Sequence, residues 1–170
     1  MDEFETVLPK LLKIQLFSSF KEDNENDRRI LKLVYENIML KKFKKGDVII
    51  TEGEYGDLLY ILYTGTVNVM RNTPAGDKIA LANLSSDQNV FFGETALISK
   101  DTRSATVKAA SDCSCIALSC KKFKELCEKE PLLGYRVLMK LAQRMAQTIR
   151  DTNNDKATLY EALFSEIEDA

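Results

Sequence analysis

Apolar residues recur at helical spacing near the start of the chain. Those between residues 3 and 20 predict a short helix, which Pro9 should interrupt early. Ile30, Val34 and Ile38 predict an amphipathic helix from Asp27 to about Met39, laid on the main body. The acidic run 21–27 between them has no periodicity, and we interpret it as a solvated loop or helix cap.

From residue 41 to about 118 the pattern changes to short strands separated by glycine-rich turns. We expect strands at 48–50, 58–63, 67–71, 78–84, 106–110 and 113–118. The segment 72–77 has the composition of a hairpin loop. Strands at intervals of roughly 8 to 12 residues are typical of a sandwich or barrel. The predicted fold is therefore mainly β with flanking helices: a β jelly-roll barrel with N-terminal and C-terminal helices.

Helical spacing returns after the strands. Ser119 is the expected N-cap of a helix over 121–129, which Pro131 ends. A longer helix should run from Leu132 to about Asp151, and a short terminal helix over 161–167 should follow a polar break at 153–155. In the longer helix, a set of positions approximates heptad spacing, which is compatible with a homodimer. These positions are Leu138, Leu141, Met145, Thr148 and Thr152.

Composition and charge narrow the classes of function. The 170 residues carry 24 Lys and Arg against 26 Asp and Glu, a net charge of −2. This balance gives no electrostatic reason to bind nucleic acid or an acidic membrane. Charges interrupt every apolar run, so we expect no transmembrane span and no signal peptide, and a cytoplasmic location.

Four cysteines leave two interpretations open, a zinc site or core packing in a reducing compartment. Cys113 and Cys115 alternate on a predicted strand, with both thiols on one face. The spacing is not that of paired structural zinc ligands, and the chain contains no histidine. We therefore expect buried thiols and no metal site.

Candidate chemistry is concentrated in residues 91–98 and 103–107. Gly93 lets the backbone approach a bound group, and a helical turn beginning there would present N–H groups to an anion. Arg103 adds a permanent charge and five donors. The carboxylate of Glu94 only accepts, which suits a sugar hydroxyl. A site for phosphate and sugar together indicates a small nucleotide. The alternative interpretation is that Glu94 and Arg103 form an ion pair with each other and bind no ligand.

The same residues resemble the phosphate-binding cassette of cyclic nucleotide-binding domains, F-G-E-x-A-L followed by R-x-A. The cassette stands here as residues 92–97 and 103–105, with the family's spacing, and the resemblance extends over roughly residues 40–150. It implies a jelly-roll barrel at 40–120 that binds cAMP or cGMP. Residues 1–39 would then form an N-terminal helical segment, and residues 121–170 C-terminal helices that act as a lid or dimerisation element.

The resemblance also implies roles for individual residues. Arg103 should meet an exocyclic phosphate oxygen, and Glu94 should accept from the ribose 2′-hydroxyl. Backbone N–H groups should bind the other phosphate oxygens. The hydroxyl of Ser104 could contact the amino group of guanine or bond to the backbone, so it does not distinguish between the two bases. The expected binding residues are Gly93, Glu94, Thr95, Ala96, Arg103, Ser104 and Ala105.

Three positions near the cassette need comment. Leu81 or Ala82 should line the purine side of the site. Asn89 stands in a region where the family often has glycine, and asparagine tolerates a left-handed backbone. Thr95 replaces the family's more usual Leu or Met, so its hydroxyl needs a partner if it points inward.

The sequence supports a regulatory module that binds a cyclic nucleotide and signals through its C-terminal helix to an unidentified protein partner. One alternative is a degenerate domain that binds a protein instead. Another is the sensor half of a transcription regulator, although the roughly twenty residues after Asp151 are too few for a DNA-binding domain. We expect no enzyme, because histidine is absent and no nucleophile–base pair is evident.

Overall fold

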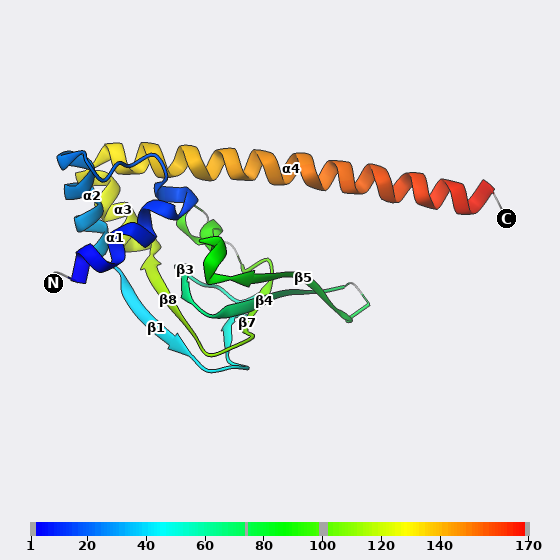
Figure 1. The fold of residues 1–170 in the computed structure, drawn as a ribbon. Coiled ribbons are helices and arrows are strands. Elements are labelled where there is room, and N and C mark those ends of the chain that lie inside the picture. The colour runs from blue at the N-terminus through cyan, green and yellow to red at the C-terminus, as the bar shows by residue number, and fades with distance from the viewer. Residues whose placement is uncertain (1–2, 74, 99–101, 169–170) are drawn as a thin grey trace.

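Two four-stranded antiparallel sheets face each other in a computed structural model that describes residues 3–73, 75–98 and 102–168 (Figure 1). The strand orders are β1-β8-β3-β6 and β2-β7-β4-β5. The strands are β1 (Met39–Phe43), β2 (Val48–Ile50), β3 (Leu58–Thr64), β4 (Thr66–Asn72), β5 (Lys78–Ser85), β6 (Phe91–Phe92), β7 (Thr106–Ala109) and β8 (Cys113–Ser119). This is the predicted jelly roll with flanking helices.

Strands β3 and β8 are buried on both faces, and each contributes to two cores. Leu59 and Ile61 face the helices, whereas Tyr60 and Leu62 face the interior of the barrel. Side chains alternate between the faces of a strand, so one strand can serve both clusters. A nearly continuous apolar run such as 58–62 is therefore what a doubly covered strand requires.

Cys113 and Cys115 lie together in the barrel core, on one face of β8 as predicted. Burial raises the pKa of the Cys115 thiol to about 12. All four cysteines are free thiols. The described residues contain no group of three or more His, Cys, Asp or Glu side chains placed to hold a metal ion.

The N-terminal helices differ in extent from the expectation. They are α1 (Glu3–Lys13), η1 (Gln15–Phe17) and α2 (Glu25–Tyr35). Pro9 lies inside α1 and does not interrupt it, because Leu8 and Leu11 on either side are fully buried and hold the helix in place. The acidic run contains a cap: the Asn24 side chain accepts from the backbone N–H of Asp27. Residues 39–43 belong to β1 rather than to the end of this helix.

The C-terminal helices are α3 (Cys120–Lys129) and α4 (Pro131–Glu168). Ser119 caps α3 as predicted, accepting from the backbone N–H of Lys122 at 3.2 Å. The predicted break at 153–155 is wrong, because α4 is continuous over 38 residues. Polar residues cost a solvated helix little, and only glycine or proline there would have been strongly unfavourable.

Only the first part of α4 is packed on the molecule. Leu133, Val137 and Leu141 are buried, whereas every residue from 145 to 165 is exposed. The heptad prediction is therefore wrong at Leu141, which packs into the core with the N-terminal helices and is not available to a second chain. The helix runs past the barrel as a long arm, above the β4–β5 hairpin (Figure 1). Within the described ranges, no helix has the length and apolar character needed to cross a bilayer.

Candidate functional site

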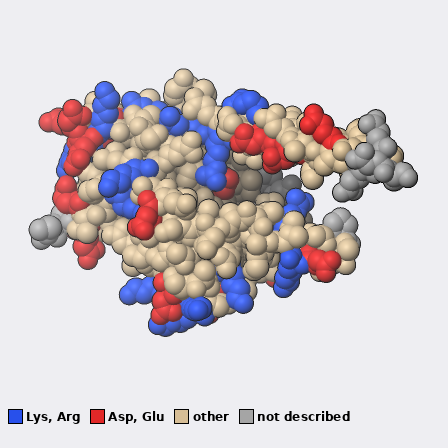
Figure 2. Space-filling model, turned by 45° about the vertical axis from the view of Figure 1, so that its right-hand side comes forward, with Lys and Arg blue, Asp and Glu red and all other residues tan. Residues whose placement is uncertain are grey.

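A cavity of about 260 Å³ lies where the cassette meets β4, β5, β7 and α4. Figure 2 shows the face of the molecule that is hollowed between an upper ridge and the lower body. The lining is apolar on the sheet side and polar on the cassette side. Its residues are Ile50, Val69, Ala82, Leu84, Phe91, Phe92, Gly93, Glu94, Thr95, Arg103, Ser104, Ala105, Val107 and Arg144.

Gly93 begins the turn that shapes the cassette. Its φ of 74° is left-handed, and it is followed by a short 3-10 helix, η3 (Glu94–Leu97). An added Cβ would lie 2.8 Å from Nη1 of Arg103 and 3.0 Å from the carbonyl oxygen of Leu58. Both the backbone conformation and the available space therefore require glycine.

Arg103 is the buried cation of the site, with 7% of its surface exposed. Its Nη1 donates to the carbonyl of Gly93 at 3.0 Å and its Nη2 to the carbonyl of Leu58 at 2.7 Å. Burial lowers its pKa, and the electrostatic influence of Tyr60, followed by that of Asp57 and Glu94, partly offsets this effect. Within the part of the chain that the structure describes, Arg103 forms an ion pair with no carboxylate.

Gly56 is a second glycine that makes room for this arginine. A Cβ at Gly56 would lie 2.5 Å from Nε and 2.7 Å from Nη2 of Arg103. Real side chains do not approach that closely, so Gly56 must lack one for the guanidinium to occupy its position.

Glu94 pairs with α4 rather than with Arg103, so the alternative interpretation of a Glu94–Arg103 ion pair is wrong. Its Oε1 lies 3.8 Å from Nε of Arg144, and the two side chains are 25% and 37% exposed. The guanidinium carbon of Arg144 also lies 4.2 Å from the ring centroid of Phe91. Sequence reasoning missed Arg144, because a cation on an amphipathic helix looks like any other solvated position.

Six of the seven predicted binding residues line the cavity. Ala96 does not, since its side chain is buried within η3, and its N–H donates to the carbonyl of Gly93 at 3.3 Å. Thr95 and Ser104 line the cavity with exposed side chains, so neither hydroxyl needs a partner inside the protein.

Two neighbouring predictions are resolved by the backbone. Ala82 lines the cavity, whereas Leu81 is 53% exposed and is not among the lining residues, as expected for successive residues of a strand. Asn89 adopts the left-handed conformation, with φ 52° and ψ 45°, and so provides the turn in place of glycine.

A larger groove of about 540 Å³ lies elsewhere, between α1, the end of α2 and the sheet. Its charged lining residues are Glu3 and Glu36, and no Lys or Arg lines it. A groove of this kind does not suit a phosphate. The smaller cavity beside Arg103 is therefore a better candidate site for an anion than this groove.

The fold and the cavity define a jelly-roll domain with a buried cation in the wall of its cavity. Residues 40–130 match the family model described as "Cyclic nucleotide-binding domain". The chain belongs to the cyclic nucleotide-binding domain family.

Two relatives and one solved structure illustrate which share of the chain is similar to known proteins. The chain is 34% identical over 68% of its length to the "cAMP-activated global transcriptional regulator CRP" of Pasteurella multocida, spanning 54% of that protein. It is 32% identical, again over 68% of its length, to the human "cGMP-dependent protein kinase 2", spanning 14% of it. A solved cyclic nucleotide-binding domain from Methylobacillus flagellatus superposes with a TM-score of 0.74 at 22% identity, covering 88% of this chain and 82% of that one, and shows the fold.

Proposed function

We propose that this chain is a regulatory module that binds cAMP or cGMP in the cavity beside Arg103, without catalysing a reaction. The observation that carries the proposal is the buried guanidinium, which donates to two neutral carbonyls and pairs with no described carboxylate. A buried charge is costly unless it is paired. A singly charged phosphodiester beside Gly93 would provide the missing partner.

Each side of the cavity suits one part of such a ligand. Arg103 would pair with an exocyclic phosphate oxygen, while backbone N–H groups of Thr95, Ala96 and Ala105 would serve the other oxygens, with Gly93 giving close approach. Ala96 would have to share its N–H with the carbonyl of Gly93. Glu94 would accept from the ribose 2′-hydroxyl, and the purine would lie toward Ala82 and Leu84.

The proposal covers two candidate bases, adenine and guanine. Ser104 lines the cavity with an exposed side chain, so its hydroxyl is available to a guanine amino group. The two curated relatives described above are named for different nucleotides at nearly equal identity. Calorimetry with cAMP and with cGMP measures which of the two nucleotides binds more tightly.

We infer that the signal leaves through the C-terminal helices, residues 121–170. Helix α4 is anchored at its base on the N-terminal helices and reaches the cavity through Arg144. A ligand in the barrel of residues 40–120 would therefore change the position of the exposed part of α4. The N-terminal segment 1–39 would hold the base of α4 fixed.

The exposed part of α4 is also the surface we propose for a homodimer or for the regulated protein partner. Met145, Ile149, Leu159, Leu163 and Ile167 are each 44% exposed or more. A helix that projects without tertiary packing is marginal in water, so a partner would stabilise it. The chain spans only 54% and 14% of the length of the two curated relatives. We propose that it acts as a cytoplasmic module, which regulates its target by direct contact.

Titration calorimetry with cAMP and cGMP tests the proposal. We expect binding of one nucleotide per chain with a favourable heat for at least one of the two. Absence of binding to either would contradict it and would favour the degenerate, protein-binding alternative. The Arg103 site would then be a structural remnant of the family.

A further inference from the structure

The groove of about 540 Å³ lies between α1, the end of α2 and the sheet that contains β1, β8 and β3. These elements meet at one end of the molecule (Figure 1), and none of the lining residues also lines the cavity beside Arg103. Most of the lining is apolar or aromatic. The residues concerned are Val7, Tyr35, Ile38, Leu40, Tyr63 and Ile116. The groove is therefore a second concave surface, which the proposed function does not use.

We propose that this groove binds a small organic cation with an apolar body, such as an alkylammonium ion. The lining extends from Ile116, which is 3% exposed, to Leu40, which is 59% exposed. An apolar chain placed along it would leave water, and burial of each methylene group would add to the affinity. The charged head would stay at the rim, in contact with water and with the acidic residues of the groove.

The charged residues of the groove are both acidic, which determines the sign of the ligand. Oε2 of Glu3 accepts a hydrogen bond from the hydroxyl of Tyr35 at 3.2 Å, which links α1 to α2. Glu36 is the second carboxylate, and among the described residues neither one forms an ion pair with Lys or Arg. A cation at the rim would be attracted by both carboxylates, and an anion would be repelled.

The position of Glu36 has no explanation within the helix that carries it. Glu36 is the C-cap of α2, where the helix dipole is negative and a carboxylate is unfavourable. Glu3, in contrast, lies in the first turn of α1, where the dipole favours a negative charge. A residue that breaks a local rule without a compensating contact is characteristic of a functional site. A bound cation beside Glu36 would provide that contact.

The size of the groove favours a small molecule over a segment of another protein. Its volume lies within the range of about 300 to 1,000 Å³ that is typical of small-molecule sites. Only nine residues line it, whereas a standard protein interface takes about 20 to 30 residues from each side. The aromatic rings of Tyr35 and Tyr63 also suit an organic cation, because their faces attract positive charge.

A titration followed by methyl NMR tests the proposal with three ligands of equal chain length: n-octylammonium, 1-octanol and octanoate. We expect n-octylammonium to shift the methyl signals of Val7, Ile38 and Leu40 and to bind at least about tenfold more tightly than octanoate, with 1-octanol between them. Shortening the cation to n-hexylammonium should weaken binding about tenfold, because two methylene groups are lost from the groove.

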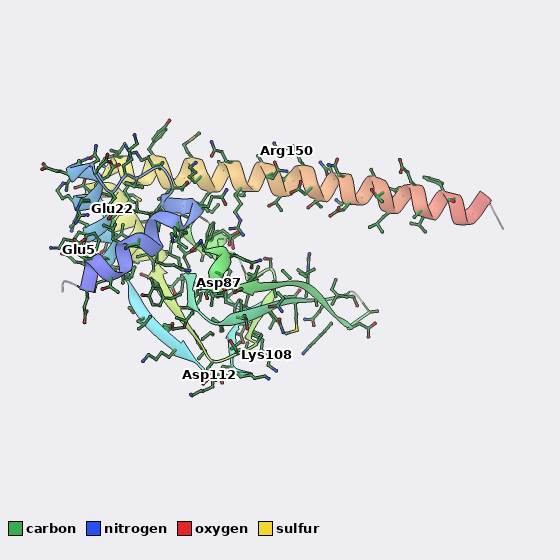
Figure 3. The ribbon with its side chains drawn as sticks, viewed as in Figure 1. Glu5, Glu22, Asp87, Lys108, Asp112 and Arg150 are labelled. Atoms are coloured by element: carbon green, nitrogen blue, oxygen red, sulfur yellow. The ribbon has the colours of Figure 1, made fainter. Side chains whose placement is uncertain are left out.

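Two exposed positions locate the charged head. Glu36→Gln should weaken the binding of n-octylammonium about two- to fivefold and leave that of 1-octanol unchanged. Glu5→Gln is the matched control: Glu5, labelled in Figure 3, also lies on α1, pairs with Arg28 and does not line the groove. It should leave the affinities for both ligands at their wild-type values.

Two neighbouring positions on β1 locate the apolar body. Leu40→Gln should weaken the binding of n-octylammonium and 1-octanol by the same factor, about threefold or more. Met39→Gln is its control, because Met39 is similarly exposed but points to the other face of the strand and does not line the groove. Both substitutions replace exposed side chains, so the fold should be retained.

Four results would overturn the proposal. They are the absence of methyl shifts with n-octylammonium at millimolar concentration, equal affinity for octanoate, unchanged n-octylammonium affinity in Glu36→Gln, and unchanged affinity in Leu40→Gln. Tighter binding of the blocked peptide acetyl-Leu-Lys-Leu-amide than of n-octylammonium would also overturn it, in favour of a protein segment. The titration needs no cyclic nucleotide, so its outcome is independent of the proposed function.

Discussion

At the scale of single residues, the site is defined by the space in which Arg103 lies. Gly56 and Gly93 approach the guanidinium from two sides, at distances that leave no room for a Cβ at either position. Leu58 and Gly93 supply the carbonyls that orient it. The two glycines therefore act on the ligand indirectly, by fixing where the charge is placed.

Replacing Gly56 should weaken nucleotide binding without unfolding the domain. In Gly56→Ala, the new methyl group would displace the guanidinium, and we expect affinity to fall by at least about tenfold, or about 1.4 kcal/mol. Calorimetry measures the change. Gly134→Ala is the control, because its Cβ would meet Cys127 at 3.1 Å, away from the cavity. Equal affinity of Gly56→Ala and wild type would show that Arg103 is not positioned this way.

The buried thiol of Cys115 should make stability depend on alkaline pH. Its pKa is about 12 in the folded protein against an ordinary value of 9.0, so the unfolded chain loses this proton first. The corresponding stability is complete below about pH 9 and is lost as pH rises toward 12. We expect about 1 kcal/mol of the free energy of unfolding to be lost between pH 8 and pH 10 through this thiol.

Urea unfolding under reducing conditions at the two pH values measures this loss, with Cys115→Ala as the comparison. The variant should be less stable at pH 8 because it leaves a cavity, but its free energy should fall less on going to pH 10. An identical fall in both proteins would contradict the assignment to Cys115.

At the scale of elements, α4 is fixed at its base by contacts with the N-terminal helices. Nη1 of Arg136 donates to Oδ1 of Asp27 at 2.7 Å, and Asp27 is almost fully buried. Its other oxygen accepts from the N–H of Lys21 at 2.9 Å. Arg29 forms two hydrogen bonds with Glu130 at the junction of α3 and α4. The base of α4 therefore moves as one unit with α2.

Arg136→Met should be strongly destabilising, because it leaves Asp27 buried without its cation. We expect a loss of about 3 kcal/mol in the free energy of unfolding, measured by urea denaturation. Arg28→Met removes an exposed pair with Glu5 and should cost less than about 1 kcal/mol. Similar losses in the two variants would show that the Asp27–Arg136 pair does not fix the helix.

The elements show where sequence reasoning succeeds and where it fails. Strand alternation, glycine-rich turns and the Ser119 cap are local signals, and the barrel and α3 follow from them. The continuity of α1 through Pro9 and of α4 through 153–155 depends on packing or solvation that no local signal reports. The cassette residues were found through their types and spacing. Arg144 reaches the cavity only because α4 passes over it.

At the scale of the whole molecule, the barrel and the exposed arm of α4 present different kinds of side chain to solvent. Lys108 and Asp112 mark the end of the barrel remote from α4 (Figure 3), where Lys44 donates to Asp112 at 2.8 Å. Basic and acidic side chains are mixed over the face seen in Figure 2. The exposed arm of α4, in contrast, offers an apolar stripe, and this surface is the one to test for association.

We expect the protein to form a dimer through the exposed arm of α4 at micromolar concentration. Leu163 and Ile167 are 55% and 68% exposed and lie four residues apart, on one face of the helix. Sedimentation equilibrium should give twice the chain mass for wild type and the chain mass for the double variant Leu163→Glu, Ile167→Glu. A monomeric wild type, or a double variant that still dimerises, would contradict the prediction.

The central claim is that the buried guanidinium of Arg103 binds the cyclic phosphate. The change in dissociation constant between wild type and Arg103→Ala is its most direct test. We predict a loss of about 2 to 5 kcal/mol in binding free energy for the preferred nucleotide, with circular dichroism verifying the fold. Arg103→Lys should recover part of the loss, because it keeps the charge but not the forked donors. A correctly folded Arg103→Ala that binds as tightly as wild type would contradict the account.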